Sequence, residues 1–288
     1  MPDSPVEIRW KKSQSRTLRS PKRCGSGVFV EDKNSRYDIG ECIAKTKGSE
    51  VSLAYDTKHD HRKVIIKKPN EDIIFKAELA ALNRLHDHKN IICLLDFYTV
   101  DTHRFLVYEY VEGQDLIDWV NEYYELKHTY LEIEDTMRPI CKQLLDALLY
   151  CHKNGVAHRD VKLDNIRINT TTKDIKLLDF GFSFTENSKM NSSTRCGSLD
   201  YAAPELVLPE VWDIIDPYKS DVWSFGVVVY VLTHYMLPYF QTKRGNYVLD
   251  KPDARFSCHL NDLLILTLQE DVTMRIQMSD VEGLSFFE

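Results

Sequence analysis

The chain has 288 residues, of which 43% are hydrophobic and 28% are charged. These proportions are typical of a globular protein and exclude a collagen-like, low-complexity or largely disordered chain. The longest apolar run, from Phe225 to Leu232, is far shorter than the roughly 20 residues needed to span a bilayer, and no apolar segment typical of a signal peptide follows Met1. We therefore expect a soluble protein of the cytoplasm, with entry into the nucleus left open.

Charge and cysteine usage exclude two further classes of function. The formal net charge is −7, although the first 23 residues hold seven Lys and Arg residues against two acidic ones. An acidic body argues against nucleic acid as a partner and suits a cationic one. The seven cysteines never show the C-x-x-C spacing of zinc or redox sites, so we expect reduced thiols.

The first predicted segments are a tail and a sheet. Residues 1–36 are basic, contain Ser and Pro, and lack sustained apolar periodicity, which predicts a flexible tail. From residue 37 to 111, short runs rich in β-branched and aromatic residues, such as 51–55 and 63–67, predict strands. Apolar positions within 74–86 approximate one helical face, so we expect one helix among these strands.

Helical patterning dominates from about residue 115 onward. Apolar residues between Met137 and Cys151 fall on one stripe, and Gly155 follows as a terminator. A sheet-rich part followed by a helix-rich part predicts two segregated lobes and not alternating βαβ units. We therefore predict an α+β, bilobal fold. Its N-lobe, 37–111, has an antiparallel sheet and one main helix, and its C-lobe, 112–287, is mainly helical.

Two short motifs carry the most chemical information. Residues 158–165 read H-R-D-V-K-L-D-N, and residues 176–181 read K-L-L-D-F-G. An acid, a cation and an amide in one loop, followed by a second acid before a glycine, can converge on a polyphosphate and its metal ion. The segments resemble the H-R-D-L-x-x-x-N and D-F-G motifs of eukaryotic protein kinases. The resemblance spans 37–287, is strongest to the AMP-activated and calmodulin-dependent kinase group, and implies the bilobal protein kinase fold.

The resemblance implies a role for each charged residue of the two motifs. Asp160 would orient the hydroxyl of the substrate, and Lys162 would contact the γ-phosphate of ATP, as is typical of serine/threonine kinases. Asn165 and Asp179 would hold Mg²⁺ ions that bridge the phosphates. Oxygen ligands suit this hard cation better than a softer metal. ATP and Mg²⁺ are therefore the expected nucleotide and cofactor.

A lysine of the sheet-rich half completes the implied catalytic set. The segment ending at Lys67 reads V-I-I-K and looks like the V-A-I-K strand whose lysine contacts the α- and β-phosphates. Glu78, in the following helix, is its implied ion-pair partner. Glu71 and Asp72 are rival carboxylates, but they lie too early for the register of that helix.

The implied glycine-rich loop departs from the family pattern. When Val51 is aligned with the last residue of G-x-G-x-x-G-x-V, Ala44, Thr46 and Ser49 replace the three glycines. Each added Cβ restricts the backbone that must approach the phosphates closely. We therefore expect weaker cover of the nucleotide by backbone N–H groups.

Other nucleotide-lining positions also differ from the pattern. Ile65 replaces a small residue above adenine, and Arg167 stands where an apolar residue usually lies beneath it, although its methylene stem could serve there. Tyr108 is the implied gatekeeper. The positions implied to contact the nucleotide are Ile43, Ala44, Thr46, Ser49, Val51, Ile65, Lys67, Tyr108, Glu109, Val111 and Arg167, with Glu109 and Val111 as hinge residues.

The segment from Cys196 to Glu205 resembles the end of a kinase activation segment, with A-P-E at 203–205. This likeness implies an internal ion pair between Glu205 and Arg275, and Asp221 as the anchor of the catalytic loop. These implied roles are structural.

Regulation is implied by the same segment. Thr194 stands where related kinases carry an activating phosphothreonine, and Arg159 is the implied partner of that phosphate. Ser192 and Ser193 are adjacent alternatives. An upstream activating kinase would then be one partner.

Substrate choice follows from the same resemblance. Asp115 and Asp164 occupy positions at which basophilic relatives bind an arginine three residues before the target hydroxyl. Paired carboxylates match the fork of a guanidinium. We therefore expect protein substrates of R-x-x-S/T type, with Ser198 on the substrate side of the site.

Three functions remain open from the sequence. The leading hypothesis is a protein serine/threonine kinase acting with Mg·ATP. A kinase-fold scaffold with weak or no nucleotide turnover is the alternative, because the glycine-rich loop is degenerate. A small-molecule phosphotransferase fits less well, because the A-P-E segment serves protein substrates. Between Phe240 and Arg244 the chain is too short for the helix that relatives carry there, so we expect a docking surface of the C-lobe to be lost.

Overall fold

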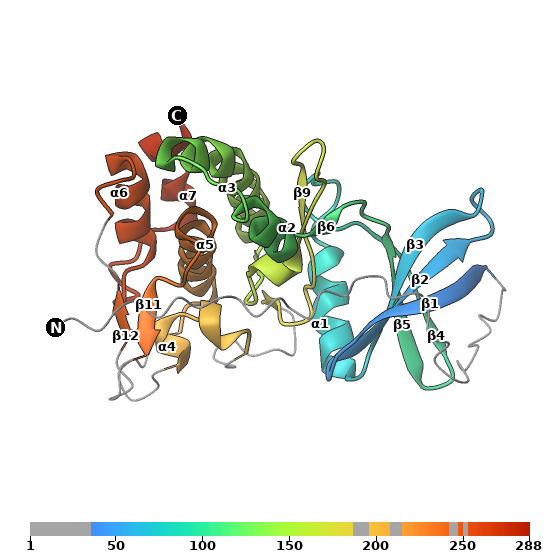
Figure 1. The fold of residues 1–288 in the computed structure, drawn as a ribbon. Coiled ribbons are helices and arrows are strands. Elements are labelled where there is room, and N and C mark those ends of the chain that lie inside the picture. The colour runs from blue at the N-terminus through green and yellow to red at the C-terminus, as the bar shows by residue number, and fades with distance from the viewer. Residues whose placement is uncertain (1–35, 187–195, 208–214, 242–246, 250–252) are drawn as a thin grey trace.

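The computed structural model describes residues 36–186, 196–207, 215–241, 247–249 and 253–288. Within these ranges the chain forms a sheet-rich lobe and a helical lobe that lie side by side (Figure 1). Thr194 and all but one residue of the predicted tail lie outside the described part of the chain. None of the described helices is long and apolar enough to cross a membrane.

The N-lobe is built on one antiparallel sheet with strand order β1-β2-β3-β5-β4. Helix α1 packs against β5. One side of the sheet buries β-branched and aromatic residues such as Val64, Phe105 and Val107 in a small core, which is the alternation that strands require. The strands and the helix are β1 (Tyr37–Lys45), β2 (Ser49–Asp56), β3 (Arg62–Pro69), α1 (Asp72–Leu82), β4 (Leu94–Val100) and β5 (His103–Glu109).

Helix α1 is shorter at its C-terminal end than the helix predicted over 74–86. The N–H groups of Arg84 and Leu85 donate to the carbonyls three residues earlier, at 2.9 and 3.2 Å. This tighter pattern ends the regular α-helix. Periodicity alone missed the change because Leu85 is still buried.

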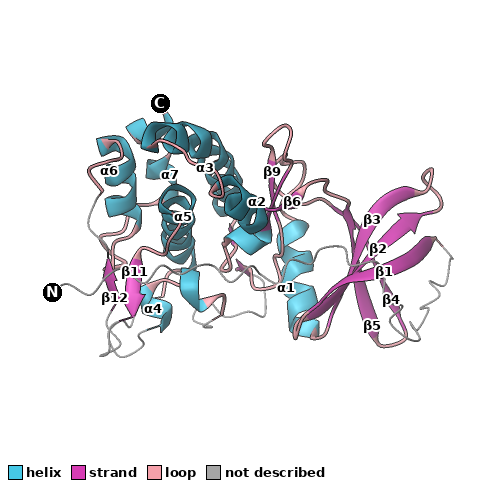
Figure 2. Cartoon of the chain, viewed as in Figure 1, coloured by secondary structure: helices cyan, strands magenta, loops and turns pink. Residues whose placement is uncertain are grey.

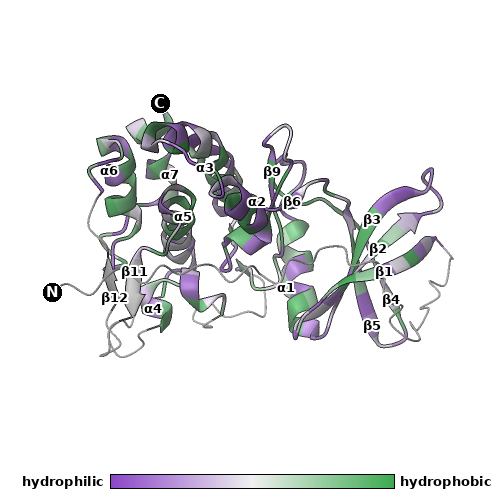
Figure 3. Ribbon diagram, viewed as in Figure 1, coloured by the Kyte–Doolittle hydropathy of each residue, from purple (hydrophilic) through white to green (hydrophobic). Residues whose placement is uncertain are grey.

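The C-lobe contains most of the helices (Figure 2). Helix α5 lies at its centre, and much of it is coloured as hydrophobic in Figure 3. Nearly all of its residues are buried, including the apolar run 227–232. It packs against α3 and α6. The helices are α2 (Leu116–Tyr123), α3 (Tyr130–Lys153), α4 (Pro204–Val207), α5 (Pro217–His234), α6 (Cys258–Thr267) and α7 (Met278–Val281), with short 3-10 turns η1 (Leu163–Asn165), η2 (Leu199–Tyr201) and η3 (Ser285–Phe287).

Side chains at their N-termini fix where the two long helices begin. The Thr129 hydroxyl accepts the N–H of Glu132, and the Glu132 carboxylate accepts the N–H of Thr129, which forms a capping box before α3. Asp216 accepts two backbone N–H groups at the start of α5, where Pro217 occupies the first turn.

Small strands at the junction of the lobes carry the residues of greatest interest. Strand β6 pairs with β8, and β8 pairs with β9, all antiparallel. A second small sheet joins β7 to β10. Their bounds are β6 (Gln114–Asp115), β7 (Val156–Ala157), β8 (Ile166–Ile168), β9 (Ile175–Leu177) and β10 (Phe184–Thr185).

Between Pro238 and residue 250 the described residues form two strands. Strand β11 (Tyr239–Gln241) pairs with β12 (Tyr247–Leu249) in antiparallel register. The sequence predicted that the helix of relatives is missing here, and the described residues of this region are extended.

Candidate active site

A buried lysine joins the two lobes. Lys67 of β3 lies with its Nζ 2.8 Å from Glu78 Oε2 of α1 and 2.8 Å from Asp179 Oδ1, which follows β9. The rival carboxylate Asp72 instead contacts Lys76 and Arg104. The structure therefore brings Lys67 together with Glu78, the partner that the resemblance implied, and also with Asp179, for which the resemblance implied only a metal-binding role.

Burial and charge act against each other in this cluster. Burial disfavours the Lys67 ammonium, but the carboxylates of Glu78 and Asp179 outweigh it and raise the pKa of Lys67. Burial likewise raises the pKa of Glu78, and the Lys67 charge offsets this only in part. The pKa of Asp179 stays below its ordinary value because Lys67 and the Gly181 N–H outweigh its burial. Asp179 is therefore ionised at neutral pH.

The acid of the catalytic loop is held on every side. Asp160 Oδ2 accepts a hydrogen bond from Asn165 Nδ2 at 2.8 Å and lies 2.8 Å from Lys162 Nζ. Its Oδ1 accepts the Ser198 N–H at 2.9 Å. Lys162 Nζ also donates to Ser198 Oγ at 2.7 Å. These contacts fix the carboxylate in one orientation between the loop and the activation segment.

Helix α5 holds the catalytic loop through one side chain. The buried Asp221 carboxylate accepts the N–H groups of His158 and Arg159 at 2.8 and 2.7 Å. Arg159 adopts a φ of 68°, in the left-handed region that non-glycine residues seldom occupy. Asp221 thus anchors the backbone of the catalytic loop to α5, as the resemblance implied.

The second motif packs on the first through His158. Its Nε2 lies 2.9 Å from the Leu178 carbonyl oxygen, and its ring meets Phe180 at 4.7 Å between centroids. The Leu178 N–H donates to the Asn165 carbonyl at 2.8 Å. These contacts bring the ends of the two motifs together, so that Asn165 and Asp179 border one site.

Asn165 and Asp179 can supply two oxygen ligands to a cation that takes its remaining ligands from water and phosphate. Asn165 uses its Nδ2 on Asp160, which leaves its Oδ1 to act as a ligand. The Asp179 side chain is 44% exposed. No group of three His, Cys, Asp or Glu residues converges as a metal site in the described part of the chain. Two oxygen ligands suit Mg²⁺, which keeps water and phosphate oxygens as its other ligands.

The turn between β1 and β2 is closed by a threonine. The Thr46 hydroxyl accepts the N–H groups of Gly48 and Ser49 at 3.2 and 3.1 Å, and the Thr46 N–H donates to the Ser49 carbonyl at 2.9 Å. The predicted weakness of this loop therefore has a specific form: three of its N–H donors are already bonded inside the loop, two of them to the Thr46 hydroxyl.

The hinge residues differ in what they can offer a nucleotide. The Glu109 N–H donates to the Cys93 carbonyl at 3.1 Å, which removes this donor from the set expected to bind adenine. Its carboxylate lies 2.7 Å from Lys176 Nζ. The gatekeeper Tyr108 is buried, whereas Ile65 and Val111 are partly buried against the main core.

Arg167 does more than present its stem beneath a nucleotide. Its Nη1 lies 3.0 Å from Asp115 Oδ1, and its Nη2 donates to the Gly113 carbonyl. Asp115, expected to read a substrate arginine, is thus paired inside the chain. The sequence reasoning missed this pair, although the charge of Arg167 at an apolar position was a signal that a partner was needed.

Gly113 is a further site residue that the sequence reasoning missed. It has a φ of +116°, and a Cβ at this position would lie 2.0 Å from the Ile168 carbonyl oxygen. Only glycine allows so close an approach. The sequence feature that could have revealed it is a single glycine between the hinge and Asp115. The absence of a side chain at Gly113 allows β6 to lie against β8.

Comparison with known proteins agrees with this geometry. The family model described as protein kinase domain matches residues 37–287. The chain belongs to the protein kinase family. Both the predicted family and the predicted fold, a sheet-rich N-lobe with a helical C-lobe, are confirmed.

Several curated relatives are protein kinases by name, and some of these names specify serine/threonine kinases. Testis-specific serine/threonine-protein kinase 3 of Homo sapiens is 34% identical over 265 residues, which cover 85% of this chain and 93% of the relative. The SNF1-related protein kinase catalytic subunit alpha KIN12 of Arabidopsis thaliana is 30% identical over 269 residues, 87% of this chain and 51% of the relative.

Other relatives are much longer than the match. Protein kinase kin1 of Schizosaccharomyces pombe is 39% identical over 160 residues, 56% of this chain, and the match spans 17% of the relative. For the probable KIN1 homolog of Enterocytozoon bieneusi, the match spans 33% of the relative. The kinase domain is therefore what this chain shares with all of them.

Proposed function

We propose that the chain is a protein serine/threonine kinase that transfers the γ-phosphate of Mg·ATP to serine or threonine hydroxyls. The observation that carries the proposal is the Lys67 ion pair with both Glu78 and Asp179, at 2.8 Å each. It aligns a phosphate-binding cation of the N-lobe with a metal-binding acid of the C-lobe. Phosphoryl transfer needs this alignment more than it needs covalent chemistry.

Each catalytic side chain has a distinct task in this reaction. Lys67 would bind and orient the α- and β-phosphates, and Glu78 would hold Lys67 in place. Asp160 would orient the attacking hydroxyl and accept its proton. Lys162 would neutralise charge that develops on the γ-phosphate. Asn165 and Asp179 would hold Mg²⁺, whose chemistry is to screen the phosphate oxygens.

The catalytic loop contacts Ser198 of the activation segment directly. Lys162 Nζ bridges Asp160 and Ser198 Oγ, so the segment that receives the substrate lies directly on the catalytic acid. A lysine here is the feature by which the sequence resembled serine/threonine kinases. We include Thr194 phosphorylation by an upstream kinase in the proposal, with Arg159 as phosphate partner.

An acidic cluster supports a preference for basic residues near the target. Asp115, Asp118 and Asp164 interact with one another: burial first, and then the neighbouring carboxylates, raise the pKa of both Asp115 and Asp118. Mutual repulsion of this kind favours binding of a cation. Turn η1, which carries the exposed Asp164, packs against both β6 and α2. A substrate guanidinium would add to the partial relief that Arg167 already gives Asp115.

The test is transfer of labelled γ-phosphate from Mg·ATP by the full chain. Matched peptides would offer serine, threonine or tyrosine as the single acceptor after an upstream arginine, with Thr194 phosphorylated beforehand in a parallel sample. We expect label on the serine and threonine peptides and none on tyrosine. If neither sample labels any peptide above Asp160→Asn, the proposed function is wrong.

The Thr46 turn makes a prediction about nucleotide affinity. Replacing Thr46 by glycine would release the N–H groups of Gly48 and Ser49, which can then bind phosphate oxygens. Hydrogen bonds to charged groups contribute about 1.5–3 kcal/mol each, and the added flexibility of glycine costs roughly 0.5–1 kcal/mol. The net gain is at least about 2 kcal/mol, so we expect the KM for ATP to fall roughly thirty-fold or more in Thr46→Gly. Initial rates against ATP concentration measure it.

A matched control separates the lost hydroxyl from the added flexibility. Thr46→Val removes the acceptor and keeps a β-branched side chain, so it frees the same N–H groups without the cost of added flexibility and should lower the KM for ATP at least as much as glycine does. An unchanged KM in both variants would show that these N–H groups do not bind the nucleotide.

A further inference from the structure

Arg167 occupies an unusual place in the C-lobe. It lies on β8, directly across from Asp115 on β6. Its Nη1 is 3.0 Å from Asp115 Oδ1, and its Nη2 reaches the Gly113 carbonyl. The Arg167 side chain is 27% exposed and that of Asp115 is 45% exposed. The guanidinium therefore sits at the surface where a substrate would meet Asp115.

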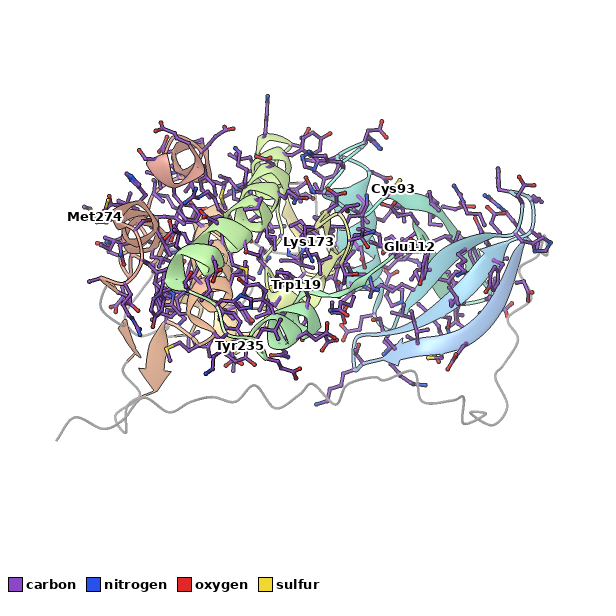
Figure 4. All side chains as sticks on the ribbon, turned by 45° about the horizontal axis from the view of Figure 1, so that its top comes forward. Cys93, Glu112, Trp119, Lys173, Tyr235 and Met274 are labelled. Atoms are coloured by element: carbon purple, nitrogen blue, oxygen red, sulfur yellow. The ribbon has the colours of Figure 1, made fainter. Side chains whose placement is uncertain are left out.

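This arginine is the cation that faces the acidic cluster of Asp115, Asp118 and Asp164. Its charge offsets only part of the rise that burial and the neighbouring carboxylates cause in the pKa of Asp115 and Asp118. The other cations of the β8–β9 hairpin are engaged elsewhere. Lys173 Nζ lies 5.0 Å from the centre of the Trp119 ring (Figure 4), and Lys176 pairs with Glu109.

Stability does not account for the pair. An ion pair exposed to this degree gains little, because water screens it. The Arg167 Nε is also buried and has no hydrogen-bond partner among the described residues, which is unfavourable for a polar group. An apolar side chain would pack on β8 without this penalty. A role in binding explains the arginine better than a role in folding.

We propose that Arg167 is a specificity-determining residue that occupies, from within the chain, the place of a substrate arginine at Asp115. A substrate arginine three residues before the target then binds mainly to Asp164. Its contribution to peptide affinity is smaller than it would be if both carboxylates were free. The kinase therefore tolerates substrates that lack this arginine. The inference rests on the proposed function for its biological meaning.

Two features let Arg167 compete with a substrate. Strand pairing of β6 and β8 holds it next to Asp115, so its local concentration is far above that of any peptide. The Gly113 carbonyl accepts a second hydrogen bond from the same guanidinium, which orients its fork. A substrate arginine must displace this contact, and displacing an exposed ion pair costs up to about a factor of five in affinity.

The test measures peptide binding, which does not require catalysis. Two fluorescent peptides would carry alanine in place of the target serine and differ only by arginine or alanine three residues earlier. The Kd ratio of the two peptides is measured by anisotropy for the full chain and for Arg167→Met, which keeps the length of the side chain. We expect the preference for the arginine peptide to rise about five-fold in Arg167→Met.

Two controls test that the effect arises at Asp115. In the Asp115→Asn background, Arg167→Met should leave the Kd ratio unchanged, because no carboxylate is left to be freed. Lys127→Met removes an exposed cation beyond the C-terminal end of α2 and should also leave the ratio unchanged. A general effect of net charge would instead appear in both controls.

The proposal is overturned if Arg167→Met leaves the ratio within two-fold of the wild type, lowers it, or raises it equally in the Asp115→Asn background. Thermal unfolding of each variant shows whether the chain is folded in the binding buffer, and Arg167→Gln, which also removes the charge, replaces Arg167→Met if that variant is unfolded. Failure of the proposed function would appear separately, as absence of label from ATP with the binding preference intact.

Discussion

Replacing Asp160 by asparagine should lower kcat for peptide phosphorylation by roughly 10²–10⁴-fold, the usual contribution of a positioned general base. The asparagine side chain has the same shape and can still accept a hydrogen bond, but it cannot accept a proton. Mg·ATP affinity should remain within a few-fold, because Asp160 faces Asn165, Lys162 and Ser198 and is not one of the proposed metal ligands. Steady-state kinetics and calorimetry measure the two quantities.

A conservative change nearby provides the control. Asp174 is exposed in the turn between β8 and β9, so Asp174→Asn removes a carboxylate of the same lobe without touching the site. It should keep kcat within two-fold. Equal kcat in Asp160→Asn and wild type would exclude Asp160 as the proton acceptor.

Replacing Arg275 by methionine should lower the free energy of unfolding by about 3–5 kcal/mol, the cost of leaving a buried charge without its partner. Arg275 donates to Glu205 through Nη1 and Nη2, at 2.7 and 2.9 Å, and both side chains are fully buried. Without the guanidinium, the Glu205 carboxylate would retain the Ser220 hydroxyl, at 3.1 Å, as its hydrogen-bond donor. We expect the unfolding midpoint to fall by roughly 10 °C, as measured by calorimetry.

Two further variants test whether burial is the cause. The double variant Glu205→Leu with Arg275→Met removes both charges and should recover part of the lost stability, because no charge is left unpaired. Arg255→Met breaks the pair between Asp253 and an arginine that is 62% exposed, and should change stability by less than about 1 kcal/mol. Similar losses in Arg255→Met and Arg275→Met would contradict the argument.

The fold and much of the site could be predicted because the motifs combine chemistry with local conformation. The loop at 158–165 holds its own geometry through Asn165 and Asp160. Its link to α5 uses the Asp221 carboxylate and two backbone N–H groups. Residues that interact over such fixed spacings keep their relation wherever the pattern occurs, so the resemblance could predict that these residues lie close together.

Contacts that depend on a neighbouring strand could not be predicted in this way. The Arg167 guanidinium meets Asp115 only because Gly113 lets β6 approach β8, and no periodicity in the sequence encodes that approach. The end of α1 was placed too late because buried Leu85 continues the apolar pattern into a tighter turn. The hydrogen bond from the Glu109 N–H to the Cys93 carbonyl likewise depends on the folded hinge and could not be predicted from the sequence.

The contact of Lys67 with Asp179 has a mechanical consequence. Lys67 moves with the N-lobe sheet, whereas Asp179 follows β9 of the C-lobe, and 112 positions of the chain separate them. Any rotation that opens one lobe from the other must stretch this link. The distance between Lys67 Nζ and Asp179 Oδ1 therefore reports how far the two lobes are closed. Proton exchange at the Lys67 ammonium would follow opening and closing directly.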